Sequence, residues 1–186
     1  TPPMWQGMGL LEDHLIQRGF SQGVTFTLVP PSYLDRMSLG EDDPRRAVVK
    51  LLKPLSEEMS ILRPLLAPSL LQVAAHNINR QNADLSLFEV GRIFAPSALD
   101  VDSEEAETLG LLMTGRRYGR AWGSPGEESV DLYDLRGAIE SLVEALKVEP
   151  LEFTPGCDEP WLVSARAWTL SRGGRPSVWL AWFTPG

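Results

Sequence analysis

The chain has 186 residues, of which 43% are hydrophobic and 23% are charged, and these fractions are typical of a soluble globular protein. They exclude a disordered or fibrous protein, and the length predicts a single module with a hydrophobic core. Lys and Arg number 17 against 25 Asp and Glu, and the net charge of −8 argues against a free-standing nucleic-acid-binding protein.

The first predicted element is an amphipathic helix over residues 4–18. Its apolar side chains recur at helical spacing, and Gly19 stands where helices commonly end. Residues 23–29 alternate apolar and hydroxyl side chains, which predicts a strand with one buried face that ends at two prolines. A short helix is expected from Ser32, and a further strand over residues 47–52.

The middle of the chain predicts a helix over residues 69–82, with Ser69 as its N-cap, followed by a strand over residues 85–94. Residues 95–107 are rich in Asp, Glu, Ser and Pro, so we expect an acidic, solvated linker there. The apolar residues 108–114 predict a short buried strand.

The C-terminal part predicts the most regular helix of the chain, over residues 131–147. A strand is expected over residues 151–154. Two further strands, over residues 163–170 and 177–183, are expected to be joined by a turn at Gly173-Gly174. Strands that form hairpins and are separated by a few helices indicate an α+β fold, with a mostly antiparallel sheet flanked by helices.

Catalytic and metal-binding constellations are missing from the sequence. His14 and His76 lie on separate predicted helices without the spacing of metal ligands, and residues 115–120 lack the glycine spacing of a phosphate-binding loop. The only cysteine, Cys157, excludes an intrachain disulfide and a cysteine-based zinc site and favours a cytoplasmic location. No apolar run approaches the roughly 18–20 residues that cross a bilayer, so we expect no membrane association.

Two groups of charged residues are open to more than one interpretation. Arg116, Arg117 and Arg120 could hold an RNA backbone, but in so acidic a chain ion pairs or a protein contact are the favoured interpretation. Glu89 and Arg92 lie in an otherwise apolar strand and must be paired to be tolerated there. An internal ion pair that supports the sheet is favoured over a ligand site.

Several colinear segments carry a resemblance to a known family. They are residues 19–29 (GFSQGVTFTLV), 52–64 (LKPLSEEMSILRP), 87–94 (LFEVGRIF) and 130–137 (VDLYDLRG). Together they closely resemble the bacterial phenylalanyl-tRNA synthetase beta subunit, in its catalytic-like module. The resemblance implies a copy of the class II synthetase fold, an antiparallel sheet with helices, that has lost catalysis.

The residues at the end of one strand agree with a loss of catalysis. The family's active subunit has a strand ending Gly-Arg-aliphatic-aromatic-Arg, whose final arginine binds the ATP phosphate, whereas residues 91–95 here read Gly-Arg-Ile-Phe-Ala. Ala95 therefore replaces the phosphate-binding cation, and the glycine-rich third class II motif is not found. We expect no activity and no cofactor in this chain alone; ATP and magnesium are implied only for the parent complex. An active class II adenylating enzyme would need both missing features.

The resemblance also implies partners. In the family this module packs on the alpha subunit of an alpha-two beta-two enzyme that attaches phenylalanine to its tRNA. The helix over residues 4–18 resembles an interface helix, so Met4, Met8, Leu11 and Leu15 are predicted to face the alpha subunit, although the same stripe could pack on its own sheet. Arg63, Glu89 and Arg92 are predicted to be structural charges.

The chain starts at Thr1 and ends after a strand-like run, so we expect residues 1–186 to be a single module excised from a longer beta subunit. The alternative is a stand-alone synthetase-like binding protein without ligase activity.

Overall fold

The structure is a computed structural model that describes residues 4–97, 103–118, 122, 128–162, 167–172 and 175–181. Its helices are α1 (Met4–Gln17), α2 (Ser32–Asp35), α3 (Ala67–Ile78) and α4 (Leu132–Ala145), with 3-10 turns η1 (Pro44–Arg46) and η2 (Glu57–Met59). Its strands are β1 (Ser21–Gln22), β2 (Leu28–Val29), β3 (Ile61–Leu62), β4 (Leu85–Pro96), β5 (Ser103–Thr114), β6 (Glu152–Pro155), β7 (Ala167–Arg172) and β8 (Arg175–Ala181). The fold is α+β, and most strand pairs are antiparallel, as predicted.

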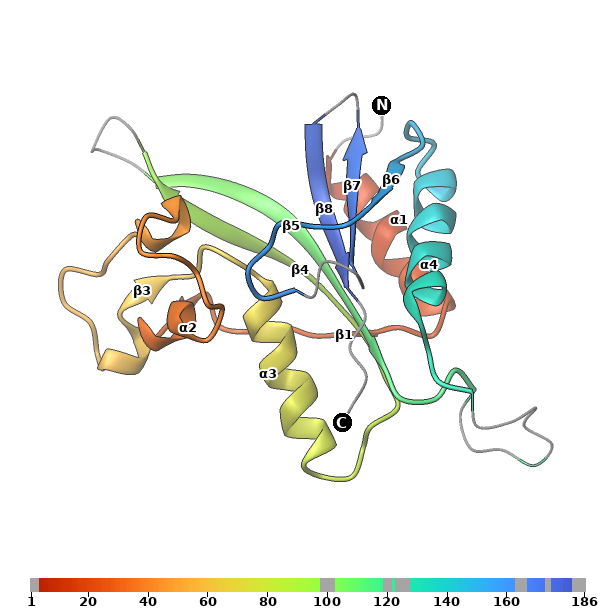
Figure 1. Ribbon diagram of the computed structural model, residues 1–186, viewed down its shortest axis with the longest axis horizontal. Coiled ribbons are helices and arrows are strands. Elements are labelled where there is room, and N and C mark those ends of the chain that lie inside the picture. The colour runs from red at the N-terminus through yellow and green to blue at the C-terminus, as the bar shows by residue number, and fades with distance from the viewer. Residues whose placement is uncertain are drawn as a thin grey trace.

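A long antiparallel hairpin of β4 and β5 crosses the molecule diagonally (Figure 1). The two strands pair along their full lengths, and β1 adds a short parallel strand to the other edge of β4. Because side chains alternate along a strand, the two faces of β4 bury different helices. Phe88 packs with Leu15 of α1 and Leu142 of α4, whereas Leu87 packs with Leu70 of α3.

Two smaller sheets flank the hairpin. Strands β6, β7 and β8 form one sheet, and its fully buried Leu170 packs against Leu135 and Ile139 of α4. Strands β2 and β3 form the other, and a cluster around Tyr33 and Ile61 fills its core. Helix α4, on the right in Figure 1, therefore packs against both α1 and the β6–β8 sheet.

The start of α4 is fixed by a capping box. The Asp131 side chain accepts hydrogen bonds from the backbone of Tyr133 (2.8 Å) and Asp134 (3.1 Å). In return the Asp134 carboxylate accepts from the Asp131 backbone at 2.8 Å. These bonds satisfy amide groups that have no partner inside the helix, which explains why the predicted helix begins here.

An ion-pair cluster holds the segment after β6 against a small lobe around β2 and β3 (the β2–β3 lobe, residues 28–65). Arg45 pairs with Asp43 and with Glu159, each at 2.6 Å, and Glu159 also accepts a hydrogen bond from the Trp161 ring at 3.0 Å. The hydrogen bonds that Asp43 accepts from the Arg45 side chain lower the pKa of Asp43 to about 2. Two parts of the chain more than a hundred residues apart are joined in this way.

Four predicted elements differ from the structure. The strand predicted over residues 23–29 is reduced to β2 (Leu28–Val29), and residues 23–27 belong to no strand. Strands β4 and β5 run through most of the predicted linker at residues 95–107, because exposed strand residues can be as acidic as a loop; residues 98–102 lie outside the described part. Helix α3 begins at Ala67, ahead of the predicted N-cap, and Ser69 lies buried inside it. The strand expected over residues 47–52 is reduced to one bridge, between Lys50 and Ile61.

At the C-terminal end, β7 and β8 start at Ala167 and Arg175, and the predicted strand residues 163–166 and 182–183 lie outside the described part. Among the described helices, none is long and apolar enough to span a bilayer.

Candidate functional site

A buried ion pair between Arg63 and Glu89 lies where the β2–β3 lobe meets the long hairpin. The guanidinium Nη1 is 2.9 Å from the Glu89 Oε1, and each side chain is only 3% exposed. Glu89 comes from the middle of β4, and Arg63 directly follows β3. Arg63 is held by its backbone as well, because its N–H donates to the Thr27 carbonyl and its own carbonyl accepts from Phe94, both at 3.0 Å.

Thr25 completes the coordination of the Glu89 carboxylate. Its hydroxyl lies 2.8 Å and 3.0 Å from the two carboxylate oxygens, and its backbone N–H donates to Oε1 at 3.2 Å. Arg63 Nη1 also donates to the Thr25 hydroxyl at 2.6 Å, and Arg63 Nε donates to the Arg92 carbonyl at 2.9 Å. No buried side-chain nitrogen or oxygen of the described residues lacks a hydrogen-bond partner. The charges are therefore compensated within the chain itself.

Gly91 makes room for this arrangement. A Cβ atom at Gly91 would collide with Arg63 Nη2 and would lie 3.1 Å from the Glu89 carboxylate. Glycine is therefore required at this point of β4, since any side chain would displace the guanidinium.

A second buried polar group fixes the start of α3 beside the ion pair. The Tyr33 hydroxyl donates to the Leu65 carbonyl at 2.8 Å, accepts from the Ser69 backbone at 3.1 Å and lies 2.8 Å from the Ser69 hydroxyl. Burial raises the pKa of Tyr33, so the phenol stays neutral and can donate. The residue expected to cap this helix instead bonds a tyrosine from another element.

The far end of the hairpin is acidic. Ala95 lies opposite Glu104 in the strand register, and the neighbouring Arg92 is exposed and lies 3.0 Å from Glu105 and 4.0 Å from Glu107. Arg92 therefore forms solvent-exposed ion pairs with the acids of β5, whereas Arg63 takes the buried partner. Glu104, Glu105 and Glu107 of β5 therefore lie opposite residues 92–95 of β4.

The arginines predicted to contact RNA or a protein, Arg116 and Arg117, form ion pairs with carboxylates of this chain. Arg116 lies 2.5 Å from Asp84. Arg117 lies 2.8 Å from Glu128, 2.9 Å from Asp134 and 3.3 Å from Asp131. The hydrogen bond that Arg117 donates to the Asp134 carboxylate, together with the surrounding acids, raises the pKa of Arg117.

The guanidinium groups of Arg116 and Arg117 are thus already engaged with carboxylates at the base of the loop, which favours the ion-pair interpretation over an RNA contact. Arg120 lies outside the described residues.

The stripe predicted on α1 contributes to the core of this chain. Leu15 is completely buried, Leu11 packs against the same cluster, and Met8 is half-buried. The side chain of Met4 lies outside the described part. Among the side chains of α1 that the structure describes, Leu10 and Ile16 are the large apolar ones that are exposed. A contact of α1 with another subunit stays a prediction.

Sequence reasoning missed Thr25 because in this segment the apolar side chains face the solvent and the threonine faces the core. Val24 is 88% exposed and Phe26 is 76% exposed, while Thr25 faces the ion pair. The predicted strand is present only as β2, and in the irregular segment before it the Thr25 hydroxyl lies on the inner side. The signal that could have found it is the buried carboxylate of Glu89, which needs hydroxyl or amide donors beside it.

The arrangement has no acid, base or nucleophile left to act on a substrate. Glu89 is bound by a guanidinium and by Thr25, and Tyr33 is held neutral. Among the described residues, no group of three or more His, Cys, Asp or Glu side chains could hold a metal ion. The geometry is that of a structural joint between the lobe and the hairpin.

Comparison with known proteins agrees with this fold. The family model described as "Phenylalanyl tRNA synthetase beta chain CLM domain" matches residues 3–185. Over 162 residues the chain is 36% identical to the phenylalanine–tRNA ligase beta subunit of Syntrophotalea carbinolica. The matched region is 87% of this chain and 20% of the relative. The corresponding beta subunit of Geobacter metallireducens is 36% identical over 163 residues, 88% of this chain and 20% of the relative.

Solved structures share the fold at lower identity. The pyrrolysyl-tRNA synthetase of Desulfitobacterium hafniense superposes with a TM-score of 0.68 at 23% identity, over 94% of this chain and 57% of that one. This chain spans about a fifth of the length of the curated relatives it matches. From its sequence and its fold, the chain belongs to the family of phenylalanyl-tRNA synthetase beta chain CLM domains.

Proposed function

We propose that this chain is a non-catalytic structural module of a phenylalanine–tRNA ligase beta subunit, which supports the alpha subunit that attaches phenylalanine to its tRNA. In this proposal the parent enzyme is a cytoplasmic alpha-two beta-two heterotetramer that uses ATP and magnesium. This chain supplies neither the ATP site nor a magnesium site, and tRNA is bound through the parent complex.

The observation that carries the proposal is the self-contained ion pair of Arg63 and Glu89. A site that binds a triphosphate must present cations to the ligand. Here the one buried guanidinium among the described residues is bound to a buried carboxylate and to Thr25, so its charge is already compensated. A ligand could take Arg63 only by leaving Glu89 as an uncompensated buried charge.

The charge at the end of the hairpin supports the same conclusion. Ala95 supplies no cation, and Glu104, Glu105 and Glu107 lie opposite residues 92–95. A polyphosphate at this edge would meet like charges, which would weaken its binding.

Two measurements test the proposal. The beta subunit that contains this module is purified alone and with the alpha subunit, and phenylalanine-dependent ATP–pyrophosphate exchange is measured in both. We expect exchange only in the complex. Exchange by the beta subunit alone would overturn the proposal, and a gene that encodes nothing beyond this module would overturn it in favour of a stand-alone binding protein.

The second measurement separates support from catalysis. The Glu89→Ala variant of the beta subunit should reduce the yield of assembled complex, because it breaks the buried pair. The complex that does assemble should keep its kcat for aminoacylation. Arg92→Ala, which removes only exposed ion pairs, is the matched control and should change neither quantity. A normal yield of Glu89→Ala complex with a reduced kcat would contradict a structural role.

A further inference from the structure

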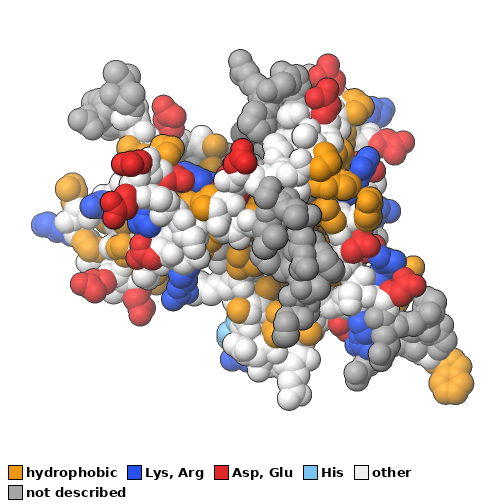
Figure 2. Space-filling model, viewed as in Figure 1, with side chains coloured by type: hydrophobic (Ala, Val, Ile, Leu, Met, Phe, Trp, Pro, Cys, Tyr) orange, Lys and Arg blue, Asp and Glu red, His pale blue; other side chains and the backbone are white. Residues whose placement is uncertain are grey.

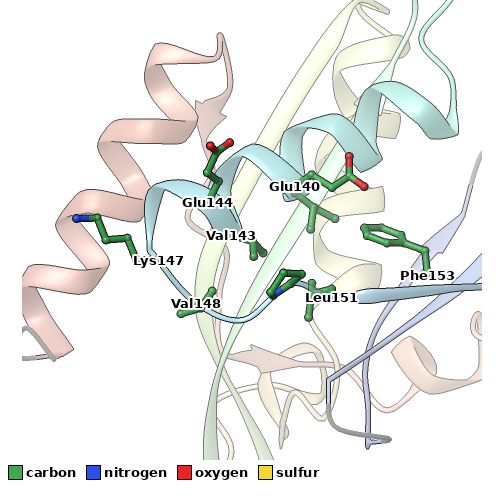
Figure 3. Close-up of a pocket in the computed structure, with 9 residues that line it drawn as sticks. Glu140, Val143, Glu144, Lys147, Val148, Leu151 and Phe153 are labelled. Carbon is green, nitrogen blue, oxygen red and sulfur yellow. The ribbon is translucent and has the colours of Figure 1, made fainter.

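A groove between α4 and the segment that leads into β6 takes no part in the site described above. It has a volume of about 520 Å³, and its walls include Val143 of α4, Val148 and Pro150 of the connecting loop, and Leu151 and Phe153 next to and within β6. The close-up shows Val143, Val148 and Leu151 between the helix and the loop (Figure 3). On the molecular surface, hydrophobic side chains gather over this side of the molecule (Figure 2).

The helical wall of the groove is a regular stripe. Its residues are Ile139, Glu140, Val143 and Glu144 of α4, and Lys147 lies two residues past the end of the helix. At 1.5 Å per residue the α4 part is about 7.5 Å long, or roughly one and a half helical turns. The carboxylates of Glu140 and Glu144 rise from the helix above the apolar residues, and Lys147 extends away at one end (Figure 3). An apolar groove with a charged margin can receive the apolar face of an amphipathic helix.

One end of the groove is held rigid before anything binds. The Arg136 guanidinium lies 4.5 Å from the centre of the Phe153 ring and 5.2 Å from that of Trp168, and it pairs with Glu140 at 2.7 Å. Phe153 and Trp168 also meet edge to face at 6.1 Å. These contacts fix the Phe153 wall, so a partner would not have to pay the entropy of ordering it.

The size and charge of the groove restrict the partner. A helical wall of about one and a half turns offers far less area than the roughly 1,200–2,000 Å² that a stable interface between separate proteins buries. A tethered partner needs less, because a linker gives it an effective concentration in the millimolar range. This chain matches only 20% of the length of a curated relative, so most of such a beta subunit lies outside it. Glu144 makes no ion pair within the described part of the chain, and it favours a basic partner over a nucleic acid.

We propose that this α4–β6 groove is the docking site for a basic amphipathic helix from another module of the same beta subunit. The proposal rests on the proposed function, because it needs the chain to be part of a longer beta subunit. Aliphatic side chains of that helix fill the space between Val143 and Leu151, and a Lys or Arg on its flank pairs with Glu144.

Cysteine labelling in the full-length beta subunit tests the docking. In a background without native cysteines, Val148→Cys reports on the groove, where this side chain is 43% exposed in the isolated fold. Ala145→Cys is the control, because Ala145 is exposed on the same helix but does not line the groove. Both sites should leave the fold intact by circular dichroism. The rate of reaction with a maleimide reagent is measured for each.

We expect Val148→Cys to react about tenfold more slowly than Ala145→Cys in the beta subunit alone, as a tethered helix that is bound nine-tenths of the time would require. Adding Glu144→Arg should restore fast labelling, because it places a like charge beside the basic flank. Equal rates at the two sites would overturn the proposal. Protection that appears only after the alpha subunit or tRNA is added would also overturn it, in favour of a separate partner. Assembly of the beta subunit with the alpha subunit is measured in parallel. A beta subunit that does not assemble contradicts the proposed function, whereas equal labelling rates in one that does assemble contradict only the docking.

Discussion

Replacing Glu89 by alanine should destabilise the chain strongly. The substitution leaves the Arg63 guanidinium, which is 3% exposed, without its carboxylate, and it removes the acceptor of the Thr25 hydroxyl and backbone amide. Removal of one partner from a buried ion pair costs about 3–5 kcal/mol. For a chain of this size that loss corresponds to a decrease in Tm of about 6–20 °C.

The measurement is urea unfolding of the 186-residue chain, followed by circular dichroism, together with thermal melts. Arg92→Ala is the control, because Arg92 is 60% exposed and its ion pairs should contribute about 0–1 kcal/mol. A double replacement, Arg63→Met with Glu89→Leu, should recover most of the loss, since apolar groups of similar size can substitute for a buried pair. A Glu89→Ala variant no less stable than Arg92→Ala would refute the assignment of the pair as a structural joint.

Four further substitutions probe other parts of the fold. Gly91→Ala should lower the stability, because its Cβ would collide with the buried guanidinium, whereas Gly7→Ala in α1 meets open space and should add about 0.5–1 kcal/mol; urea melts of the two variants give the comparison. The pKa of Asp43 is lowered from 3.8 to about 2 by hydrogen bonds to Arg45, so it contributes stability above pH 3.8 that is lost as the pH falls towards 2. Acid titration of Asp43→Asn should show a smaller loss of stability over that interval, and an unchanged profile would contradict the pairing. Asp131→Ala should cost about 1 kcal/mol through loss of the α4 cap, and a helix content and melting curve identical to those of the parent chain would argue against the capping box.

The sequence alone predicts those helices and strands whose hydrophobic pattern is distinctive by itself. Helix α4 combines a regular apolar stripe with a capping residue at position 131, and β4 is an apolar run interrupted by charges, so both were predicted to within a few residues. The charge in that strand also indicated that Glu89 needs a partner, since an unpaired carboxylate is costly in a core. Arg92 is three positions from Glu89 on the same strand, so the two side chains point to opposite faces. A single sequence does not identify Arg63 as the partner, because that contact depends on how the segment after β3 packs on β4.

Other predictions failed where one local sequence pattern fits two structures, such as a loop and an exposed strand. Tertiary contacts decide between the two in such cases. An acidic segment is solvated whether it forms a loop or the exposed end of a hairpin, so residues 103–107 gave no sign of β5. Alternation over residues 23–29 shows that two faces differ, but only the position of Glu89 determines that Thr25 turns inward. Leu15 has the spacing of an interface residue and of a core residue alike.

The outward-facing Val24 and Phe26 have a consequence for the isolated chain in solution. Within the described part of the chain, the backbone groups of these two residues make no hydrogen bonds, while Gly23 and Thr25 on either side of Val24 are bonded to β4. A segment with unpaired backbone groups and exposed apolar side chains is a template on which a second strand can form. At high protein concentration such edges attract one another, and a short β-rich segment with little charge is the usual starting point of aggregation. Val24→Lys or Phe26→Lys would add charge to this segment and would keep the chain dispersed in solution without touching the ion pair beneath.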